Sequence, residues 1–274
     1  MFDRLSILVL ISILFLPYSV YSFGGTTHQR ITEEVYQQSG TDLPWEELIK
    51  GSTYPDDVEN DGGTYAGHFY NAEGNNTSPN ALERMYIHFR KAVDEYKKKN
   101  KKKAAFELGQ AMHYMEDMTC PVHTWGYAFN IIPSHLFIHA MYEDVLDKLP
   151  SYEFPRYIPE KGRLNQTDLK RNAVFRNQQV NQGSTSTLLK KRVKNESFKD
   201  ALMRSFDPDA LGDTTTGSAI LDLILSFSMD KTGALAKKVI PEIDTTHDLD
   251  IAFLACCDLF YYFCKETGLI SHFN

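Results

Sequence analysis

The chain has 274 residues and a formal net charge of −7 at pH 7. This length is enough for one sizeable hydrophobic core, or at most two small ones. An acidic protein has no general electrostatic attraction to nucleic acid or anionic lipid, so any such binding must come from a local site.

Residues 1–22 are typical of a secretory signal peptide and are not expected to belong to the fold. A basic residue precedes an apolar run from Leu5 to Leu16, and small or apolar residues occupy the usual cleavage offsets before Phe23. The run is too short to span a membrane, and no later segment has about eighteen uninterrupted apolar residues. We therefore expect a secreted or periplasmic protein whose mature chain, residues 23–274, begins at Phe23.

The first part of the mature chain combines two helices with a long loop. A helix is expected from about His28 to Gln38, with Thr26 or Thr27 as its cap. A short helix is expected over Leu43–Lys50. The following segment, Gly51–Asn76, is rich in Gly, Asp, Asn and Tyr and has no helical period. Long irregular loops inside a compact domain are usually functional or disordered.

A further helix is expected over Pro79–Lys98, where apolar residues recur at spacings of three and four. His88 falls off that apolar stripe, which favours a surface or core-edge position. The lysine-rich segment Lys97–Lys103 follows. It is compatible with a patch that binds an anionic partner, but a solvated turn between helices is the simpler interpretation.

The most informative stretch lies in the next expected helix, Ala104–Met118. His113 and Asp117 are four residues apart, so they project from the same helix face one turn apart. Pro121 ends the helix because proline lacks an N–H and restricts the preceding residue. His123 follows this break, so its side chain can return toward the same space from another direction.

A second pair with the same spacing, His139 and Glu143, lies in an expected helix over Ser134–Leu149. Imidazoles and carboxylates on facing helix turns are zinc or di-metal ligands by residue type and geometry. A single His-x-x-x-Asp arises often by chance. The compound pattern H-Y-x-x-D-x-x-x-P-x-H followed by H-x-x-x-E is much more specific. His135 is either a support for this site or merely structural.

The rest of the chain shows helical pattern without a motif. The expected helices are Leu164–Val180, Thr185–Ser205, Thr216–Phe227, Gly233–Ile240 and Thr246–Thr267. Ile251–Phe263 is apolar nearly all round and should be buried. Cys256 and Cys264 in that helix are roughly 12 Å apart, too far to bridge. A disulfide bond involving Cys120 is left open, although buried free thiols are the simpler interpretation.

These segments resemble the signature of the secreted bacterial zinc-dependent phospholipases C, a family that includes the bacillary enzymes and the clostridial alpha-toxin type. Gly51-Ser52-Thr53-Tyr54-Pro55-Asp56 and Gly67-His68-Phe69-Tyr70-Asn71 look like two further ligand segments of that family. The resemblance runs from about Phe23 to Glu143. It implies an all-α fold, a single compact multi-helix domain of the phospholipase C and zinc nuclease type.

The resemblance also implies a set of zinc ligands: Phe23, His28, Asp56, His68, His113, Asp117, His123, His139 and Glu143. They would form three zinc sites. Asp56, His68, His113 and Asp117 would hold the first zinc. Asp117 would bridge to the second, together with His28 and the free amine and carbonyl of Phe23, where the family more often has Trp. His123, His139 and Glu143 would hold the third.

The implied reaction is hydrolysis of a phospholipid to diacylglycerol and a phosphorylated head group. Bound zinc lowers the pKa of a water molecule to about 7 and neutralises charge on the phosphodiester. Asp56 would act as general base by family analogy. Asp57 is its rival as ligand, and Asp56 is preferred because it follows Pro55 directly, as in the family.

Two alternatives are distinguished by the sequence. The related fungal-type single-strand zinc nucleases share the helical fold and the cluster but typically end in H-x-x-x-D, where this chain has His139 and Glu143. A non-enzymatic zinc-storage protein is disfavoured because the implied ligand sets leave coordination positions open, whereas structural zinc sites are closed.

The charge around the motifs favours lipid over nucleic acid. The segments Phe23–His28, Gly51–Asn71 and His113–Glu143 contain no Lys or Arg, whereas a nuclease usually meets several phosphates with basic side chains. We expect a phospholipid substrate at a membrane or micelle surface, no stable nucleic acid binding, and a monomer. Thr26 lies near the position of a carboxylate with which bacillary members contact choline, so the head group stays open.

Overall fold

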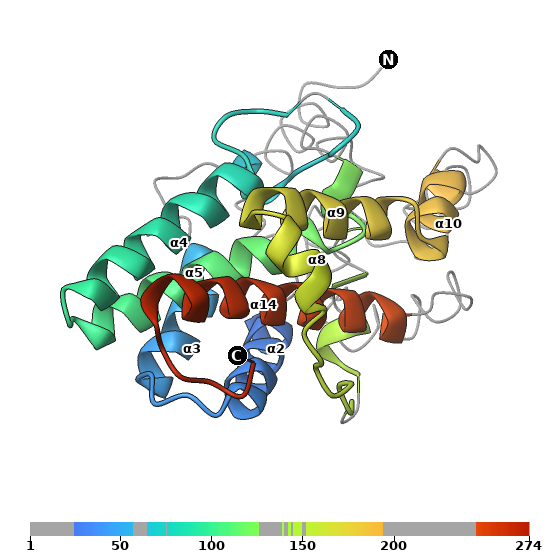
Figure 1. The fold of residues 1–274 in the computed structure, drawn as a ribbon. Coiled ribbons are helices and arrows are strands. Elements are labelled where there is room, and N and C mark those ends of the chain that lie inside the picture. Colours follow the sequence, from blue (N-terminus) through green and yellow to red (C-terminus); the bar gives the residue numbers. More distant parts are fainter. Residues whose placement is uncertain are drawn as a thin grey trace, which may run out of the picture.

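The computed structural model describes residues 25–56, 65–74, 76–125, 139, 142–143, 145–149, 152–193 and 245–273. All regular secondary structure within these ranges is helical, which confirms the all-α prediction (Figure 1). The expected signal peptide, Phe23, Asp57 and His135 lie outside the described residues. So do the expected helices Thr216–Phe227 and Gly233–Ile240.

The N-terminal half supplies most of the elements that form the site. They are α2 (Gly25–Ser39), α3 (Trp45–Thr53), η1 (Tyr54–Asp56), η2 (Tyr65–His68), α4 (Ala81–Lys97), α5 (Lys101–Met118) and η3 (His123–Trp125). Asn80 begins α4 with a capping box, because its side chain accepts from the Glu83 N–H while the Glu83 carboxylate accepts from the Asn80 N–H. His88 in α4 is buried, where a surface or core-edge position was expected, and its Nδ1 atom lies 2.8 Å from Glu107 Oε2.

The central element is α5, which is buried along most of its length after the first turn. It contacts α2, α3, α4, α9 and α14. In Figure 1 α3, α4 and α5 lie together on one side of the molecule, and α14 crosses in front. A helix surrounded in this way can present polar side chains to the interior only where several of them face one another.

The structure corrects the expected start of the long loop after residue 50. Helix α3 continues to Thr53 and is followed at once by η1, so the segment up to Asp56 is helical. Helices α3 and α5 approach each other closely at Gly51 and Gly109. A Cβ on Gly109 would lie 2.2 Å from the Leu48 carbonyl oxygen, and one on Gly51 would lie 2.1 Å from the Phe106 carbonyl oxygen. Glycine at both positions lets α3 run along α5 toward the site.

The C-terminal half contains α8 (Lys161–Gln166), α9 (Leu169–Asn181), α10 (Ser184–Val193) and α14 (Thr245–Thr267). The single helix expected over Leu164–Val180 is wrong, because the chain breaks between Gln166 and Leu169. The Thr167 hydroxyl donates to the Arg163 carbonyl and ends α8, while the Asp168 side chain accepts from the Arg171 N–H and begins α9.

Helix α14 is buried over most of Ile251–Phe263, as its composition predicted. It also carries one fully buried charge, Asp258. The Asp258 carboxylate accepts hydrogen bonds from Tyr157, Arg163, Asn172 and Arg176. This carboxylate therefore connects α8, α9 and the segment before α8 to the core.

The four cysteines are buried and free, so no disulfide involves Cys120. None of the helices in the described ranges combines the length and apolar character that a membrane crossing requires.

Candidate metal centre

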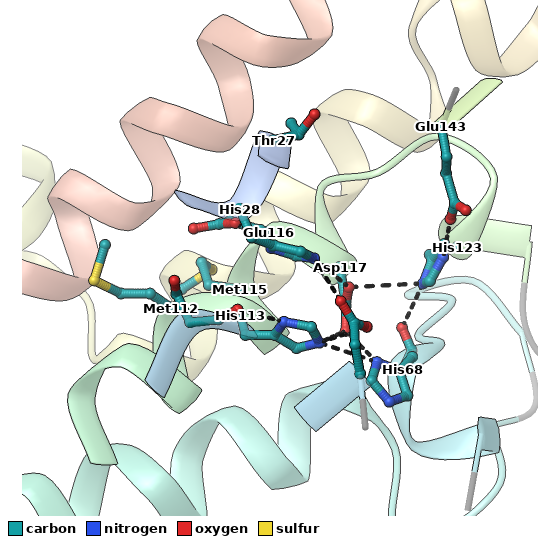
Figure 2. Close-up of polar contacts among 12 residues, drawn as sticks. Thr27, His28, His68, Met112, His113, Met115, Glu116, Asp117, His123 and Glu143 are labelled. Carbon is teal, nitrogen blue, oxygen red and sulfur yellow. Dashed lines mark hydrogen bonds and ion pairs between the residues drawn. The ribbon is translucent and has the colours of Figure 1, made fainter. Parts of the chain in front are cut away.

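Three groups of potential metal ligands lie around the C-terminal end of α5. Figure 2 labels six of their residues: His28, His68, His113, Asp117, His123 and Glu143. The groups are His28, His113 and Asp117; Asp56, His68 and His113; and His123, His139 and Glu143. The ligand atoms within each group lie within 4.8 Å of one another. These residues come from α2, η1, η2, α5, η3 and the helical residues near position 143.

The first two groups meet at His113, which is completely buried. Its Nε2 atom lies 3.5 Å from Asp56 Oδ1, 3.4 Å from Asp117 Oδ2 and 3.2 Å from His68 Nδ1. Two atoms bound to one tetrahedral zinc at 2.0–2.1 Å lie roughly 3.3 Å apart. The spacing of these side chains therefore fits a zinc ion between them.

His28 approaches the same cluster from α2. Its Nε2 atom lies 3.9 Å from Asp117 Oδ1 and 3.9 Å from Asp56 Oδ2. Asp117 thus faces His28 with one oxygen and faces His68 and His113 with the other, since His68 Nδ1 is 2.9 Å from Asp117 Oδ2. This is the arrangement a bridging carboxylate requires. Phe23, the other residue predicted for this position, lies outside the described residues.

The third group is formed by His123, His139 and Glu143. The Nε2 atoms of the two histidines are 2.8 Å apart, and His123 Nε2 is 3.4 Å from Glu143 Oε1. His139 Nε2 also contacts Glu143 Oε1. The His139 and Glu143 pair lies one helical turn apart, as the sequence spacing predicts, and the fold places it opposite η3.

Backbone carbonyls fix the orientation of two of the rings. His113 Nδ1 donates to the Ser52 carbonyl at 2.8 Å, and His123 Nδ1 donates to the His68 carbonyl at 2.8 Å. A carbonyl oxygen only accepts, so Nδ1 carries the proton and Nε2 keeps its lone pair toward the cluster. Supports of this kind are typical of metal-binding histidines.

Burial lowers the pKa values of three histidines in these ligand groups. It lowers the pKa of His139 to about 3 and that of His123 to about 4, and it lowers the pKa of His113 well below its ordinary value. These rings are therefore neutral at pH 7, the state in which imidazole binds a metal.

Burial has the opposite effect on the pKa values of the carboxylates, which it raises. Burial raises the pKa of Glu143 to about 7 and raises that of Asp117 well above its ordinary value. Asp117 Oδ1 is buried and makes no hydrogen bond within the described part of the chain. Buried carboxylates that face neutral imidazoles are costly unless a cation compensates them. The donor set and its electrostatics therefore fit a metal centre.

Sequence reasoning missed several residues beside this centre. Glu116 contacts His28 Nδ1, whereas Asp117 faces the other ring nitrogen, Nε2. The Arg84 guanidinium packs on the backbone of Gly67 and donates to the Tyr114 hydroxyl at 3.0 Å, although no motif segment contains a basic residue. Asp147 accepts from both the N–H and the hydroxyl of Thr27. Glu116 adjoins Asp117 in the motif, but only packing reveals that its side chain faces α2.

The sequence of this chain is similar to a family of zinc-dependent enzymes and to two of the bacterial phospholipases C. The family model described as zinc dependent phospholipase C matches residues 27–207, more than half of the chain. Phospholipase C from Bacillus cereus is 30% identical over 112 residues, which cover 38% of this chain and 39% of that enzyme. Phospholipase C from Paraclostridium bifermentans is 34% identical over 117 residues, which cover 37% of this chain and 29% of that enzyme.

The match therefore spans less than half the length of these two relatives. Among solved structures, alpha toxin from Clostridium absonum superposes with a TM-score of 0.54 at 18% sequence identity, covering 90% of this chain and 66% of that one. This likeness concerns the fold. The family match covers most of α2 and every described element from α3 to α10, but not α14. It also includes every residue of the three ligand groups. The chain belongs to the zinc-dependent phospholipase C family.

Proposed function

We propose that this protein is a secreted or periplasmic zinc-dependent phospholipase C. It hydrolyses the phosphodiester bond of a phospholipid to give diacylglycerol and a phosphorylated head group. The observation that carries the proposal is the convergence of Asp56, His68 and Asp117 on His113 Nε2, at 3.2–3.5 Å, in a chain of this family.

Three zinc ions are proposed per chain. Asp56, His68, His113 and Asp117 would hold the first, and His123, His139 and Glu143 would hold the third. Asp117 would be shared with the second, for which His28 and the amine and carbonyl of Phe23 are the other proposed ligands. Within this scheme His113 lies near His28 as well, since their rings stack at 4.1 Å.

When bound, zinc supplies a Lewis acid that activates water at neutral pH and neutralises charge on the phosphodiester. The chain's own residues do the rest. Asp56, whose side chain is 5% exposed, belongs to the second ligand group and would accept the proton of the attacking water as general base. The backbone carbonyls of Ser52 and His68 hold His113 and His123 in the orientation that keeps their Nε2 atoms toward the cluster.

The substrate is a lipid rather than a nucleic acid, and the enzyme acts as a monomer at a membrane or micelle surface. Arg84 adds one cation beside the cluster, which suits a single phosphodiester, whereas a polynucleotide usually meets several basic side chains. The family match also favours lipid over the single-strand nuclease alternative.

Product analysis tests this proposal. The purified protein, loaded with zinc, is offered short-chain phosphatidylcholine, phosphatidylethanolamine and single-stranded DNA in parallel. We expect diacylglycerol and a phosphorylated head group from at least one lipid, with little cutting of DNA. Efficient cutting of DNA with both lipids untouched would move the protein to the nuclease branch of the fold and leave the metal centre in place.

A further inference from the structure

We propose that Glu116 is a positioning residue of the metal centre, which holds His28 in the tautomer and orientation needed to bind zinc. Glu116 precedes Asp117 in the chain but belongs to none of the three ligand groups. This inference rests on the proposed zinc centre, and it adds a residue of this chain that acts through a ligand rather than on the metal.

Two side chains, Glu116 and His113, hold the His28 ring (Figure 2). Its Nδ1 atom contacts Glu116 Oε2, and both side chains are completely buried. Its opposite nitrogen, Nε2, faces Asp117 and Asp56. Its ring stacks on the His113 ring with an angle of 26° between the planes. The ring is thus held in its plane by His113 and in its rotation by Glu116.

The tautomer follows from this contact. The Glu116 carboxylate accepts a hydrogen bond from His28 Nδ1–H, so the lone pair of the neutral ring resides on Nε2, toward Asp117. A carboxylate behind a ligating imidazole also increases the basicity of the metal-facing nitrogen. His113 and His123 obtain the same tautomer from backbone carbonyls, so His28 is the ring among these three that a carboxyl side chain supports.

Glu116 is itself fixed by residues from two other helices. The Thr32 hydroxyl, one turn after His28 in α2, donates to Glu116 Oε1 at 3.4 Å, and the Cys256 thiol of α14 donates to the same oxygen at 3.5 Å. Successive residues of a helix point about 100° apart, since there are 3.6 residues per turn. Asp117 therefore faces the ligand groups while Glu116 faces α2.

The test uses zinc binding as its readout. Metal-free protein is titrated with zinc in competition with a chromophoric chelator, for the wild type and for Glu116→Gln. Glutamine keeps an oxygen that can accept from His28 Nδ1–H but removes the carboxylate, and mutation of such an outer partner typically weakens metal affinity by about 10–100-fold. We expect this loss for one zinc of the Glu116→Gln protein and wild-type affinity for the others. The visible spectrum of the cobalt(II)-substituted variant should change as well.

Glu107→Gln is the matched control. Glu107 lies on the same helix and also contacts a histidine, with His88 Nδ1 at 2.8 Å, but His88 belongs to none of the ligand groups. The Glu107→Gln protein should keep the wild-type zinc affinities and cobalt spectrum. Thermal unfolding of both metal-free variants separates lost stability from lost metal binding.

Identical zinc affinities and cobalt spectra in wild type and Glu116→Gln would overturn the inference. If Glu116→Gln does not fold, Glu116→Asp replaces it, because the shorter side chain keeps the carboxyl group but withdraws it from His28. Wild-type zinc affinity in Glu116→Asp would equally overturn the role. A wild-type protein that takes up no zinc would instead reject the proposed centre, and the role of Glu116 with it.

Discussion

At the scale of single residues, the site depends on which nitrogen of each histidine carries the proton. Three rings present Nε2 to the cluster because an oxygen accepts from Nδ1: Ser52 O for His113, His68 O for His123, and Glu116 for His28. Burial keeps His113 and His123 neutral by lowering their pKa values. The acceptors therefore decide where each lone pair points.

His113→Ala should lower the metal content, because the Nε2 atom of His113 lies among the proposed ligands of the first zinc. We expect the loss of at least one zinc and a fall in activity beyond the 10–100-fold typical of a supporting residue. Elemental analysis after mild dialysis measures the metal. His88→Ala is the control: it removes a buried histidine that contacts Glu107, so it should lower stability but keep full zinc content.

An extra residue before Phe23 should weaken zinc binding if the amine of Phe23 is a ligand. A peptide-bonded nitrogen is an amide and a poor ligand, whereas a free α-amine, with an ordinary pKa near 7.7–8.0, deprotonates and binds. Asp147 holds Thr27, four residues further on, and so fixes the chain close to His28. Unchanged zinc content and turnover in the extended protein would exclude the N-terminus from the centre.

At the scale of elements, the contact between α3 and α5 controls the position of Ser52 and Asp56. Gly51 and Gly109 allow the two backbones to approach so closely that a single added Cβ would meet a carbonyl oxygen. Helix α3 consequently ends beside the C-terminal half of α5. Asp56 follows this closely packed contact in the chain, and its Oδ1 atom lies 3.5 Å from His113 Nε2.

Gly109→Ala should therefore be destabilising, by about 1–3 kcal/mol as for an overpacked core. It should also weaken zinc binding, because the two helices must separate and Asp56 moves with α3. Urea unfolding and zinc titration measure the two effects. Gly162→Ala is the control in α8, where an added Cβ meets no atom within 4 Å, and its stability should stay equal or rise slightly. A Gly109→Ala protein with wild-type stability would contradict the packing argument.

At the scale of the whole molecule, α14 joins the N-terminal and C-terminal halves. It contacts α2, α4, α5 and α9. Cys256 reaches Glu116 on one side of α14, and Asp258 accepts from Arg163 and Arg176 on the other. The support of the metal centre and the attachment of α8 and α9 thus depend on one buried helix.

Asp258→Asn should cost about 3–5 kcal/mol of unfolding free energy, because two arginines lose a buried counter-charge. Glu266→Gln is the control on the same helix. Its ion pair with Arg90 is solvent-exposed, so the expected cost is only about 0–1 kcal/mol. Chemical denaturation measures the unfolding free energy of both variants. Equal stability of the two proteins would show that Asp258 is not the connection we infer.

The sequence by itself determined what depends on local spacing. A helical period fixes that His113 and Asp117, or His139 and Glu143, share one face, and an apolar run such as Ile251–Phe263 can only be buried. The all-α class was implied by the resemblance to the zinc-dependent phospholipases C, and the helical periods of the expected elements agree with it. The break after Gln166 was missed because Thr167 and Asp168 act through side-chain bonds to the backbone, which the apolar period does not register.

Only the tertiary structure decided which surfaces meet. Glu116 faces His28, Arg84 reaches Tyr114, and His113 lies between two ligand groups because α2, α4 and α5 pack at particular distances and rotations. Those contacts join residues far apart in the chain, and no local period encodes them. The ligand types and their spacing along the chain could be predicted, whereas the residues that orient them follow from the packing of buried helices.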